Sequence, residues 1–213
     1  RAGVTSLGFS GTNCHLVIEE YEKDTQTDKE FEGNVLTLSA LKRQGLKRLI
    51  NDYLQLLETD EELSIDNICY TANTGRGHYR YRLALVVRDI DHLKEQLRKV
   101  ASLEDLAQIE EEGIYYGDKR VVGYRERLGD NEITEGDKLE LTRRSQKIID
   151  QNDGNWTNLI EQLAKIYIKG GKIDWVSLYS SSSLHKIPVP GYPFARERHW
   201  VEVKSDKSHD SIS

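Results

Sequence analysis

The 213-residue chain contains no methionine, only three prolines and only two cysteines. Because a complete translation product normally begins with methionine, a chain that opens on Arg1 is expected to be a fragment of a longer protein. No run of residues approaches the ~20 apolar positions that a membrane-spanning helix needs, and no signal-peptide pattern opens the chain. The cysteines, Cys14 and Cys69, lack metal-ligand spacing, so we expect reduced thiols in a cytoplasmic protein.

Positive charge is also in the minority. Thirty lysine and arginine residues stand against 36 aspartate and glutamate residues, which leaves a formal net charge of -6. This balance argues against nucleic acid as the main partner. Hydrophobic residues make up 37% of the chain and charged residues 31%. The chain can therefore bury a core, while much of its surface must face water.

Apolar periodicity predicts an α/β unit in the first half of the chain. Strands are expected at 35–38, at 83–87 and, more weakly, at 115–122. A stripe with helical spacing from Leu46 to Leu57 predicts one helix, and Ser64 and Asp91 are placed to cap two more. The order strand–helix–helix–strand–helix–strand predicts a small three-stranded sheet with helices packed on one face.

The second half of the chain predicts an extra helical element and an extended tail. A strong apolar stripe runs from Trp156 to Tyr167, after a weaker one at 141–149. All three prolines lie within 188–193, and this segment must be extended because proline fixes φ and lacks an N–H donor. The predicted divisions are 1–20, a linker at 21–33, the α/β unit at 34–125, the helical element at 126–170, the tail segment at 171–203 and a disordered end at 204–213.

The sequence holds no recognisable catalytic motif. There is no G-x-S-x-G elbow for a serine nucleophile. Cys14 and His15 are neighbours on a predicted strand, where adjacent side chains point to opposite faces. The six histidines show no zinc spacing. We therefore expect no catalytic residue, no bound cofactor and no metal site in this chain.

A local cluster of basic residues surrounds the turn before the second predicted strand. The cluster consists of Arg76, Arg80, Arg82 and Arg88. It could receive an acidic partner. Charges that flank a strand more often form a solvated edge that discourages strand pairing, so both interpretations stay open.

Residues 1–20 resemble the C-terminal end of the ketosynthase domains of modular polyketide synthases. The stretch G-F-S-G-T-N-C-H at 8–15 is similar to a G-F-G-G-T-N-A-H turn that leads into the last core strand of a thiolase-like fold. Ser10 and Cys14 replace the commoner glycine and alanine. By this resemblance, the flexible loop that gates the acyl pocket is formed by Gly8, Phe9, Gly11 and Thr12.

Two further stretches resemble the elements around such ketosynthases. Residues 34–103 are similar to the linker domain that follows the ketosynthase, with L-T-L-S-A at 36–40 and H-Y-R-Y-R-L-A at 78–84. The stretch P-V-P-G-Y-P-F-A-R-E-R-H-W at 188–200 resembles the post-acyltransferase linker, which wraps back across the linker domain onto the ketosynthase. The resemblance places the wrapping contacts at Trp175, Tyr192, Pro193, Phe194 and Trp200.

The short distance between the two linkers implies a type of synthase. Synthases with an integrated acyltransferase carry several hundred residues there, whereas only about 103–173 intervenes here, as in trans-acyltransferase synthases. The implied parent is an antibiotic-producing polyketide synthase that condenses acyl units and carries phosphopantetheine on its carrier proteins. None of the ketosynthase motifs with the catalytic cysteine and histidines occurs here, so the resemblance implies a non-catalytic part.

Three roles remain open for this part. The helical element could join synthase copies laterally in a weak homo-oligomer, with contacts at Leu139, Leu141, Ile148 and Ile149. The arginine cluster could instead dock an acyl carrier protein or a free-standing acyltransferase. The third role is a purely intramolecular scaffold for the ketosynthase. It is supported by the general rule that an amphipathic stripe usually packs within its own chain.

Overall fold

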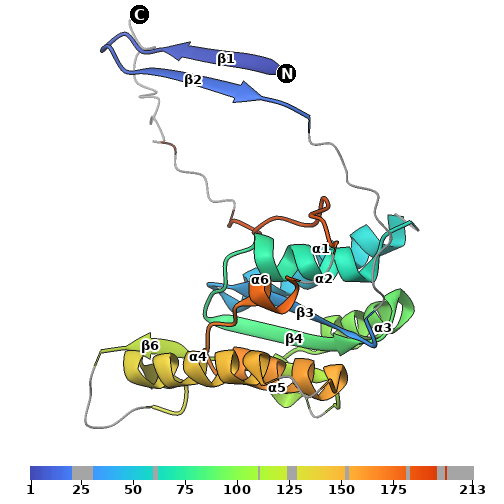
Figure 1. Ribbon diagram of the computed structural model, residues 1–213. Coiled ribbons are helices and arrows are strands. Elements are labelled where there is room, and N and C mark those ends of the chain that lie inside the picture. Colours follow the sequence, from blue (N-terminus) through green and yellow to red (C-terminus); the bar gives the residue numbers. More distant parts are fainter. Residues whose placement is uncertain are drawn as a thin grey trace, which may run out of the picture.

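The structure is a computed structural model (Figure 1). It describes residues 1–20, 31–59, 62–109, 111–123, 129–151, 154–180, 183–195 and 200. The predicted linker at 21–33 lies largely outside these residues, and the predicted disordered end at 204–213 lies entirely outside them. The elements in chain order are β1 (Ala2–Leu7), β2 (Asn13–Ile18), β3 (Asn34–Ala40), α1 (Arg43–Thr59), α2 (Ile65–Gly75), β4 (Tyr81–Val87), α3 (Ile90–Ser102), the 3-10 turn η1 (Leu106–Gln108), β5 (Ile114–Asp118), β6 (Arg120–Val122), β7 (Glu132–Thr134), α4 (Glu135–Asp150), α5 (Trp156–Ile168) and α6 (Trp175–Leu178).

A three-stranded antiparallel sheet in the order β3-β4-β5 forms the centre of the body. Leu36 pairs with Leu85, and Leu83 pairs with Tyr116. The strand β4 is central, and its Leu83, Ala84 and Leu85 are fully buried. This explains its continuous apolar run, because a strand covered on both faces has no solvent side to alternate with.

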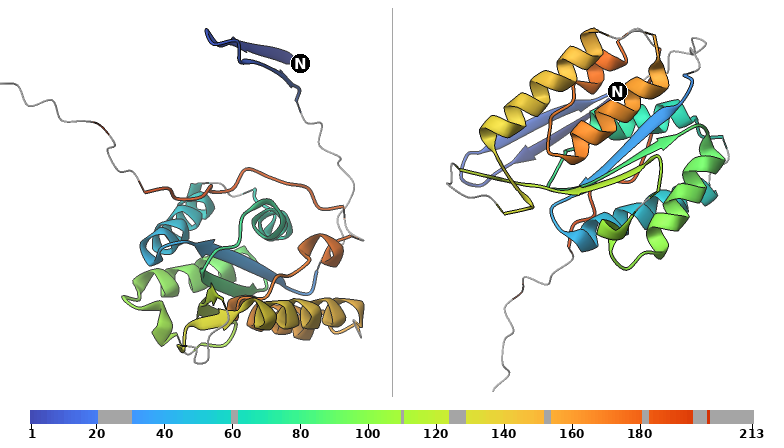
Figure 2. Two further views of the ribbon diagram at one scale, coloured as in Figure 1. Left: turned by 90° about the vertical axis from the view of Figure 1, so that its left-hand side faces the viewer. Right: turned by 90° about the horizontal axis from the view of Figure 1, so that it is seen from below.

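The two faces of the sheet contact separate cores. Leu36 and Leu85 face α1, α2 and α3, so the three helices predicted to share one face do so. Val35 and Ala84 face α5, where Ile160 is fully buried. Figure 1 and the left view of Figure 2 show α4 and α5 on one side of the sheet and α1 and α2 on the other. The predicted fold class is confirmed, and the extra helical element closes the second face of the sheet.

Polar caps determine where the helices begin. Ser64 caps α2, as the sequence predicts. The cap of α3 is Asp89, whose carboxylate accepts a hydrogen bond from the backbone N–H of His92 at 2.7 Å. The prediction of Asp91 as this cap was wrong by two residues, because Asp89 has the extended backbone of a cap and Asp91 lies within the first turn. Thr134 caps α4 in a reciprocal capping box.

The strand predicted at 115–122 is two strands. It breaks after Asp118, and Arg120–Val122 turns away as β6 to pair in parallel with β7. Gly117 lies in β5 where the end of α5 crosses it, and a Cβ there would overlap the main-chain oxygen of Ile168. Glycine is therefore required in this strand by the close approach of α5.

The strands β1 and β2 form an antiparallel hairpin, and every residue from 1 to 20 is exposed. Figures 1 and 2 show this hairpin standing apart from the body. Its register pairs Val4 with Leu16 and Gly3 with Val17. The hairpin thus contributes no residue to either core of the body.

Residues 183–195, here called the C-terminal strap, run in extended form back along α2. The backbone N–H of His185 donates to Oδ1 of Asn67 at 3.0 Å, and that of Ile187 donates to Oγ1 of Thr71 at 3.0 Å. Side chains of α2 therefore satisfy strap amides that no sheet partner pairs. The predicted extended, wrapping tail is confirmed for this segment.

Candidate interaction surfaces

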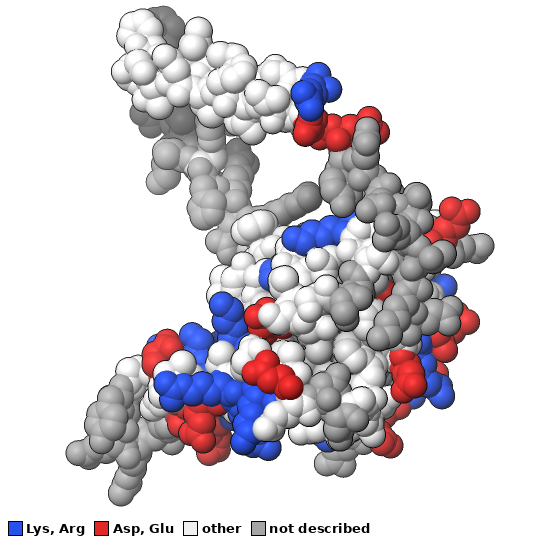
Figure 3. Space-filling view, in the orientation of Figure 1, with Lys and Arg blue, Asp and Glu red and all other residues white. Residues whose placement is uncertain are grey.

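The hairpin presents apolar side chains on both of its faces. Leu16 and Ile18 point to one face and Val17 points to the other, and each is more than half exposed. Figure 3 shows that the hairpin surface is nearly uncharged apart from one end. An isolated two-stranded hairpin is marginally stable in water, because it cannot bury such side chains by itself. The hairpin is therefore an apolar surface on which no other described residue of this chain packs.

The turn of the hairpin needs its glycines. The backbone N–H of Gly8 donates to the carbonyl of Thr12 at 2.8 Å, and a Cβ at Gly8 would lie 2.6 Å from that oxygen. Gly11 has a φ of 88°, in the left-handed region that glycine adopts without strain. Phe9 is fully exposed between them. The gating role implied for these four residues stays a prediction.

Tyr192 and Pro193 anchor the far end of the strap on the body. The Tyr192 ring packs edge-on against Tyr79 at 4.9 Å, and its hydroxyl accepts a hydrogen bond from the backbone N–H of Leu41 at 3.2 Å. The Arg76 guanidinium donates to the carbonyls of two strap residues at 2.7 and 3.2 Å. Arg76, one of the four predicted docking arginines, therefore holds the strap.

The other residues predicted for wrapping contacts divide into two groups. Trp175 is buried in the second core, where it packs edge-on against Tyr167. Phe194 and Trp200 are each 76% exposed. The carbonyl of Phe194 still accepts a hydrogen bond from Arg48 at 3.5 Å, and the Phe194 ring packs edge-on against Tyr192 at 4.8 Å, but both aromatic side chains beyond Tyr192 are mostly exposed.

Arg80 and Arg82 also have partners within the chain. Arg80 pairs with the buried carboxylate of Asp118 at 2.6 Å. Arg82 donates to the carbonyls of Tyr167 and Gly171 at 2.8 and 2.7 Å, and it lies over the Tyr167 ring at 4.7 Å. Burial lowers the pKa of the Arg82 guanidinium. Arg82 therefore ties β4 to the end of α5 and to the loop that follows.

The four predicted docking arginines do not form one patch. Arg76 lies under the strap, Arg80 and Arg82 lie at the start of β4, and Arg88 is exposed beyond the other end of that strand. Neighbours in the sequence separate here because β4 is extended between them. Docking at this cluster stays a prediction, with three of its four members engaged in intramolecular contacts.

A histidine–tyrosine pair lies beside Arg82. His78 Nε2 lies 3.0 Å from the carbonyl oxygen of Asn73, and its Nδ1 lies 3.0 Å from the Tyr167 hydroxyl. A carbonyl can only accept, so Nε2 carries the proton and the Tyr167 hydroxyl donates to Nδ1. Burial lowers the pKa of His78 and raises that of Tyr167. Both groups are therefore neutral near pH 7, and they lock α5 to the end of α2.

The helix α4 places the four predicted self-association residues differently from one another. Leu141, Ile148 and Ile149 are partly buried against the core that α5 covers. Leu139 is 51% exposed. The apolar stripe of α4 is thus used mainly within the chain, because α4 packs on α5. Of the predicted four, only Leu139 is more than half exposed, and self-association through these residues stays a prediction.

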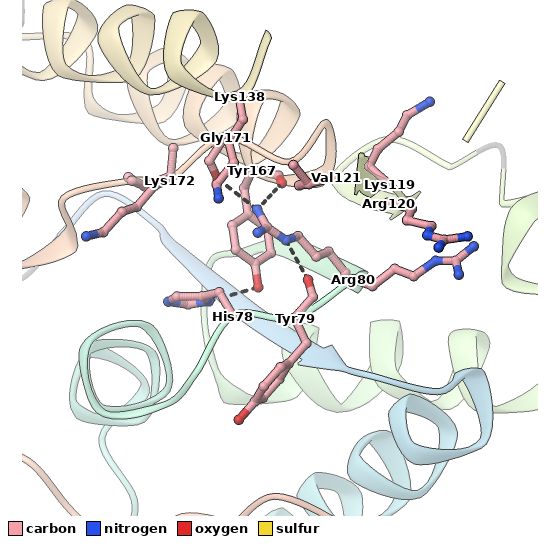
Figure 4. Close-up of a pocket in the computed structure, with 12 residues that line it drawn as sticks. His78, Tyr79, Arg80, Lys119, Arg120, Val121, Lys138, Tyr167, Gly171 and Lys172 are labelled. Carbon is pink, nitrogen blue, oxygen red and sulfur yellow. Dashed lines mark hydrogen bonds between the residues drawn. The ribbon is translucent and has the colours of Figure 1, made fainter. Parts of the chain in front are cut away.

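A basic cleft of about 450 Å³ lies between the start of β4, the β5–β6 connection, α4 and the loop after α5 (Figure 4). Its cationic lining residues are Arg80, Arg82, Lys119, Arg120, Lys138 and Lys172. Among the described residues, no acidic side chain lines it. Sequence analysis missed this cleft, because its cations come from distant segments and only two of them belong to the predicted arginine cluster.

Other chemistry is sparse in the part of the chain that the structure describes. Within these residues no group of three or more histidine, cysteine or acidic side chains could hold a metal ion. Cys14 is exposed and Cys69 is buried, where burial raises the pKa of the thiol. No described helix is long and apolar enough to span a membrane.

The sequence of this chain is similar to known proteins. Residues 34–97 match the family model described as CurL-like, PKS C-terminal. Polyketide synthase PksN of Bacillus subtilis (strain 168) is 30% identical over 207 residues, which cover 95% of this chain and 4% of that protein. Polyketide synthase PksM of the same organism is 32% identical over 212 residues, which cover 98% of this chain and 4% of that protein. The chain thus spans a small fraction of the curated relatives it matches.

Solved structures agree. The ketosynthase from module 6 of the bacillaene synthase from Bacillus subtilis 168 is similar with a TM-score of 0.62 and 25% identity, over 93% of this chain and 33% of that chain. Ketosynthase twelve from the bacillaene polyketide synthase in Bacillus amyloliquefaciens is similar with a TM-score of 0.57 and 25% identity, over 93% of this chain and 29% of that chain.

The fold and these comparisons define a class: the chain is a region that flanks a ketosynthase. More narrowly, it belongs to a ketosynthase-associated region of a polyketide synthase, and its residues 34–97 match the CurL-like, PKS C-terminal family model. The resemblance to a ketosynthase-flanking region is thereby confirmed, and the trans-acyltransferase type stays a prediction.

Proposed function

We propose that this chain is a non-catalytic structural subdomain that is anchored to the ketosynthase of its parent synthase. Two uncovered surfaces support the proposal. One is the hairpin, and the other is the exposed aromatic end of the strap, Phe194 and Trp200. The body between them is held by two cores of its own. A body with its own cores and two exposed apolar segments is suited to serve as a structural spacer that packs against the ketosynthase.

The hairpin is the observation that carries this proposal. All of its apolar side chains are exposed, although their types and alternation are those of strands in a sheet. At ~25 cal/mol per Å² of apolar area, side chains of this size gain about 1.5–3 kcal/mol each when they are fully buried. The ketosynthase would supply that cover by pairing with the strands and packing on their faces.

The test compares the same substitutions in two contexts. Val17→Asp and Leu16→Asp, one on each face of the hairpin, are made in this chain alone and in the parent ketosynthase expressed together with it. We expect the melting temperature of the chain alone to stay unchanged, and that of the ketosynthase unit to fall by several degrees for at least one variant. Ser6→Ala, at an exposed polar residue of the same hairpin, serves as the control. Equal effects in both contexts would contradict the proposal.

The non-catalytic role has its own measurement. The purified chain is incubated with an acyl thioester, and free thiol release is followed with a thiol reagent. We expect no release above the buffer rate, because neither described sulfur has a base partner and Cys69 is buried with a raised pKa. Turnover that survives repurification would refute this role.

The parent is, in this proposal, a trans-acyltransferase polyketide synthase of the bacterial cytoplasm. The support is the compact connection between α3 and α6, where β5 to β7, α4 and α5 occupy the place of an integrated acyltransferase domain. Such a parent would hold phosphopantetheine on its carrier proteins and make an antibiotic-type polyketide. Mass spectrometry of the parent's carrier domains, with and without a separate acyltransferase, tests this assignment: loading by the parent alone would contradict it.

Lateral association of synthase copies is a second candidate, and Leu139 is the observation that favours it. This leucine is 51% exposed on the outer side of α4. We expect sedimentation across a concentration series to show weak self-association that Leu139→Asp abolishes. Val176→Asp, at a comparably exposed apolar residue on α6, is the matched control. A monomer at every concentration, or equal loss in both variants, would end this candidate.

A further inference from the structure

The basic cleft gathers six cationic side chains that the proposed function does not use. Its six cations come from β4, from the β5–β6 connection, from α4 and from the loop after α5. The chain as a whole carries a net charge of -6. Six cations around one hollow, with no acidic residue among the described residues of its lining, are therefore not a consequence of composition.

Two of these cations are neutralised by carboxylates. Arg80 pairs with Asp118, and Lys138 pairs with Glu135 at 3.3 Å. The other four are Arg82, Lys119, Arg120 and Lys172. Among the residues that the structure describes, none of these four has a carboxylate partner within ion-pair distance. Among the described residues, four positive charges of the cleft therefore lack a carboxylate partner, and their mutual repulsion favours a bound anion.

Hydrogen bonds and ring packing hold the base of the cleft in place. Arg82 is held by three main-chain carbonyls through Nε and Nη1, while its Nη2 bonds to no described residue. The Tyr167 ring under the guanidinium fixes its plane, and the Tyr167 hydroxyl is itself held by His78. The two Nη2 hydrogens are therefore the donors that this fixed guanidinium can offer to an oxyanion.

Further cations line the cleft around this base. Figure 4 shows the Arg80 and Arg120 guanidinium groups close together at one end of the cleft, and Lys172 toward the other end. Lys119 donates to the carbonyl of Asp130. The lining also includes the apolar side chains of Val121 and Ile173. A ligand with both an anionic head and a less polar arm would find complementary groups here.

We infer that the basic cleft binds a phosphate group carried on an organic arm. The volume of about 450 Å³ suits a phosphate ester of metabolite size and is too small for a protein helix. The phosphate ester could be a free metabolite, or it could be the prosthetic arm of a carrier protein. The inference does not depend on how the chain is attached to the ketosynthase.

Isothermal titration of the chain at low salt with three probes tests the inference. The probes are inorganic phosphate, pantetheine 4′-phosphate and unphosphorylated pantetheine. We expect binding of the first two and none of the third. Equal affinity for the two phosphates assigns the site to free phosphates, and tighter binding of pantetheine 4′-phosphate assigns it to the prosthetic arm. Failure of both phosphates to bind at millimolar concentration would overturn the inference.

A charge-matched pair of variants separates a site from general attraction. Arg120→Gln with Lys172→Gln removes two exposed cations of the cleft, and Arg143→Gln with Lys147→Gln removes two exposed cations from α4 outside it. We expect the first variant to lose at least tenfold in affinity and the second to lose less than twofold. Equal loss in both would reduce the effect to screening of net charge and overturn the inference. Arg82 is left intact because it ties α5 to β4.

Discussion

The body and the hairpin contain antiparallel strands of similar composition that end in opposite environments. Leu36 and Leu85 are paired in the body and fully buried, whereas Val4 and Leu16 are paired in the hairpin and each 53% exposed. The strand signal in the sequence is the same in both regions. Apolar alternation therefore indicates that a strand must pack against other residues. It does not indicate whether those residues belong to the same chain.

The largest expected effect that sharpens this comparison comes from removing a leucine in the central strand. Leu83→Ala should destabilise the chain by about 2–5 kcal/mol, because it leaves a cavity between the sheet and α1 to α3. Val17→Ala in the hairpin should change the free energy of unfolding by less than about 0.5 kcal/mol. Urea denaturation followed by circular dichroism measures both. A loss above 1 kcal/mol for Val17→Ala would show that the hairpin belongs to the folded body.

The next effect concerns the crossing of α5 over β5. Gly117→Ala should cost about 1–3 kcal/mol, because its Cβ would overlap the main-chain oxygen of Ile168 and push the helix away. Gly123→Ala is the control, since nothing lies within 4 Å of a Cβ there. Thermal unfolding measures the stability of both variants. A Gly117→Ala variant as stable as the control would mean that α5 does not close the second face as described.

A smaller effect is expected at the strap. Tyr192→Ala removes the contact with Tyr79 and the hydrogen bond from Leu41, and it should cost about 1–2 kcal/mol. Phe194→Ala, two residues further along, should cost only about 0.5 kcal/mol, because that ring is mostly exposed and its described ring contact is with Tyr192 itself. Limited proteolysis should also cut the strap faster in Tyr192→Ala. Equal stability and equal cleavage rates of the two variants would mean that the strap, like the hairpin, does not contribute to the folded body.

The smallest effect is a pH dependence confined to the body. Because burial lowers the pKa of His78, the unfolded chain binds a proton more readily than the folded one. The contribution of His78 to stability is therefore complete above the unfolded value of ~6.5 and is lost as the pH falls below it. We expect the slope of unfolding free energy against pH between 6.5 and 5 to decrease in His78→Gln, by less than ~1.4 kcal/mol per pH unit.

The control for this pH dependence is His15→Gln in the hairpin. His15 lies outside both cores, so its loss should leave the slope as it is in the unmodified chain. Denaturant titrations at four pH values measure the slopes. An unchanged slope in His78→Gln would mean that the His78–Tyr167 pair is not a neutral, buried lock.

Local signals accounted for much of the fold. The buried run in β4, the stripe in α1 and the Ser64 cap were readable because each depends on side chains within a few residues of one another. The cap of α3 was misassigned to Asp91 because two aspartates lie two residues apart, and only the backbone conformation distinguishes them. The break after Asp118 was missed because β6 pairs with β7, a contact that no local pattern encodes.

The candidate surfaces were less predictable than the fold. Four arginines close together in sequence suggested one docking patch, but extended and turn backbone separates them and gives three of them internal partners. The stripe on α4 suggested a self-association face, but α5 and the second core cover most of it. A pattern of charge or apolarity identifies residues that need partners without saying which partners they find.

By itself, the sequence determined the strands, the helices, the extended strap and the resemblance to a ketosynthase-flanking region, because periodicity, proline geometry and motif order are local properties of the chain. Only the tertiary structure decided that α5 closes the second face of the sheet and that cations from four separate segments surround one cleft. The physical reason is that the position of a helix on a sheet, and the sum of charges around a hollow, depend on contacts between residues far apart in the sequence.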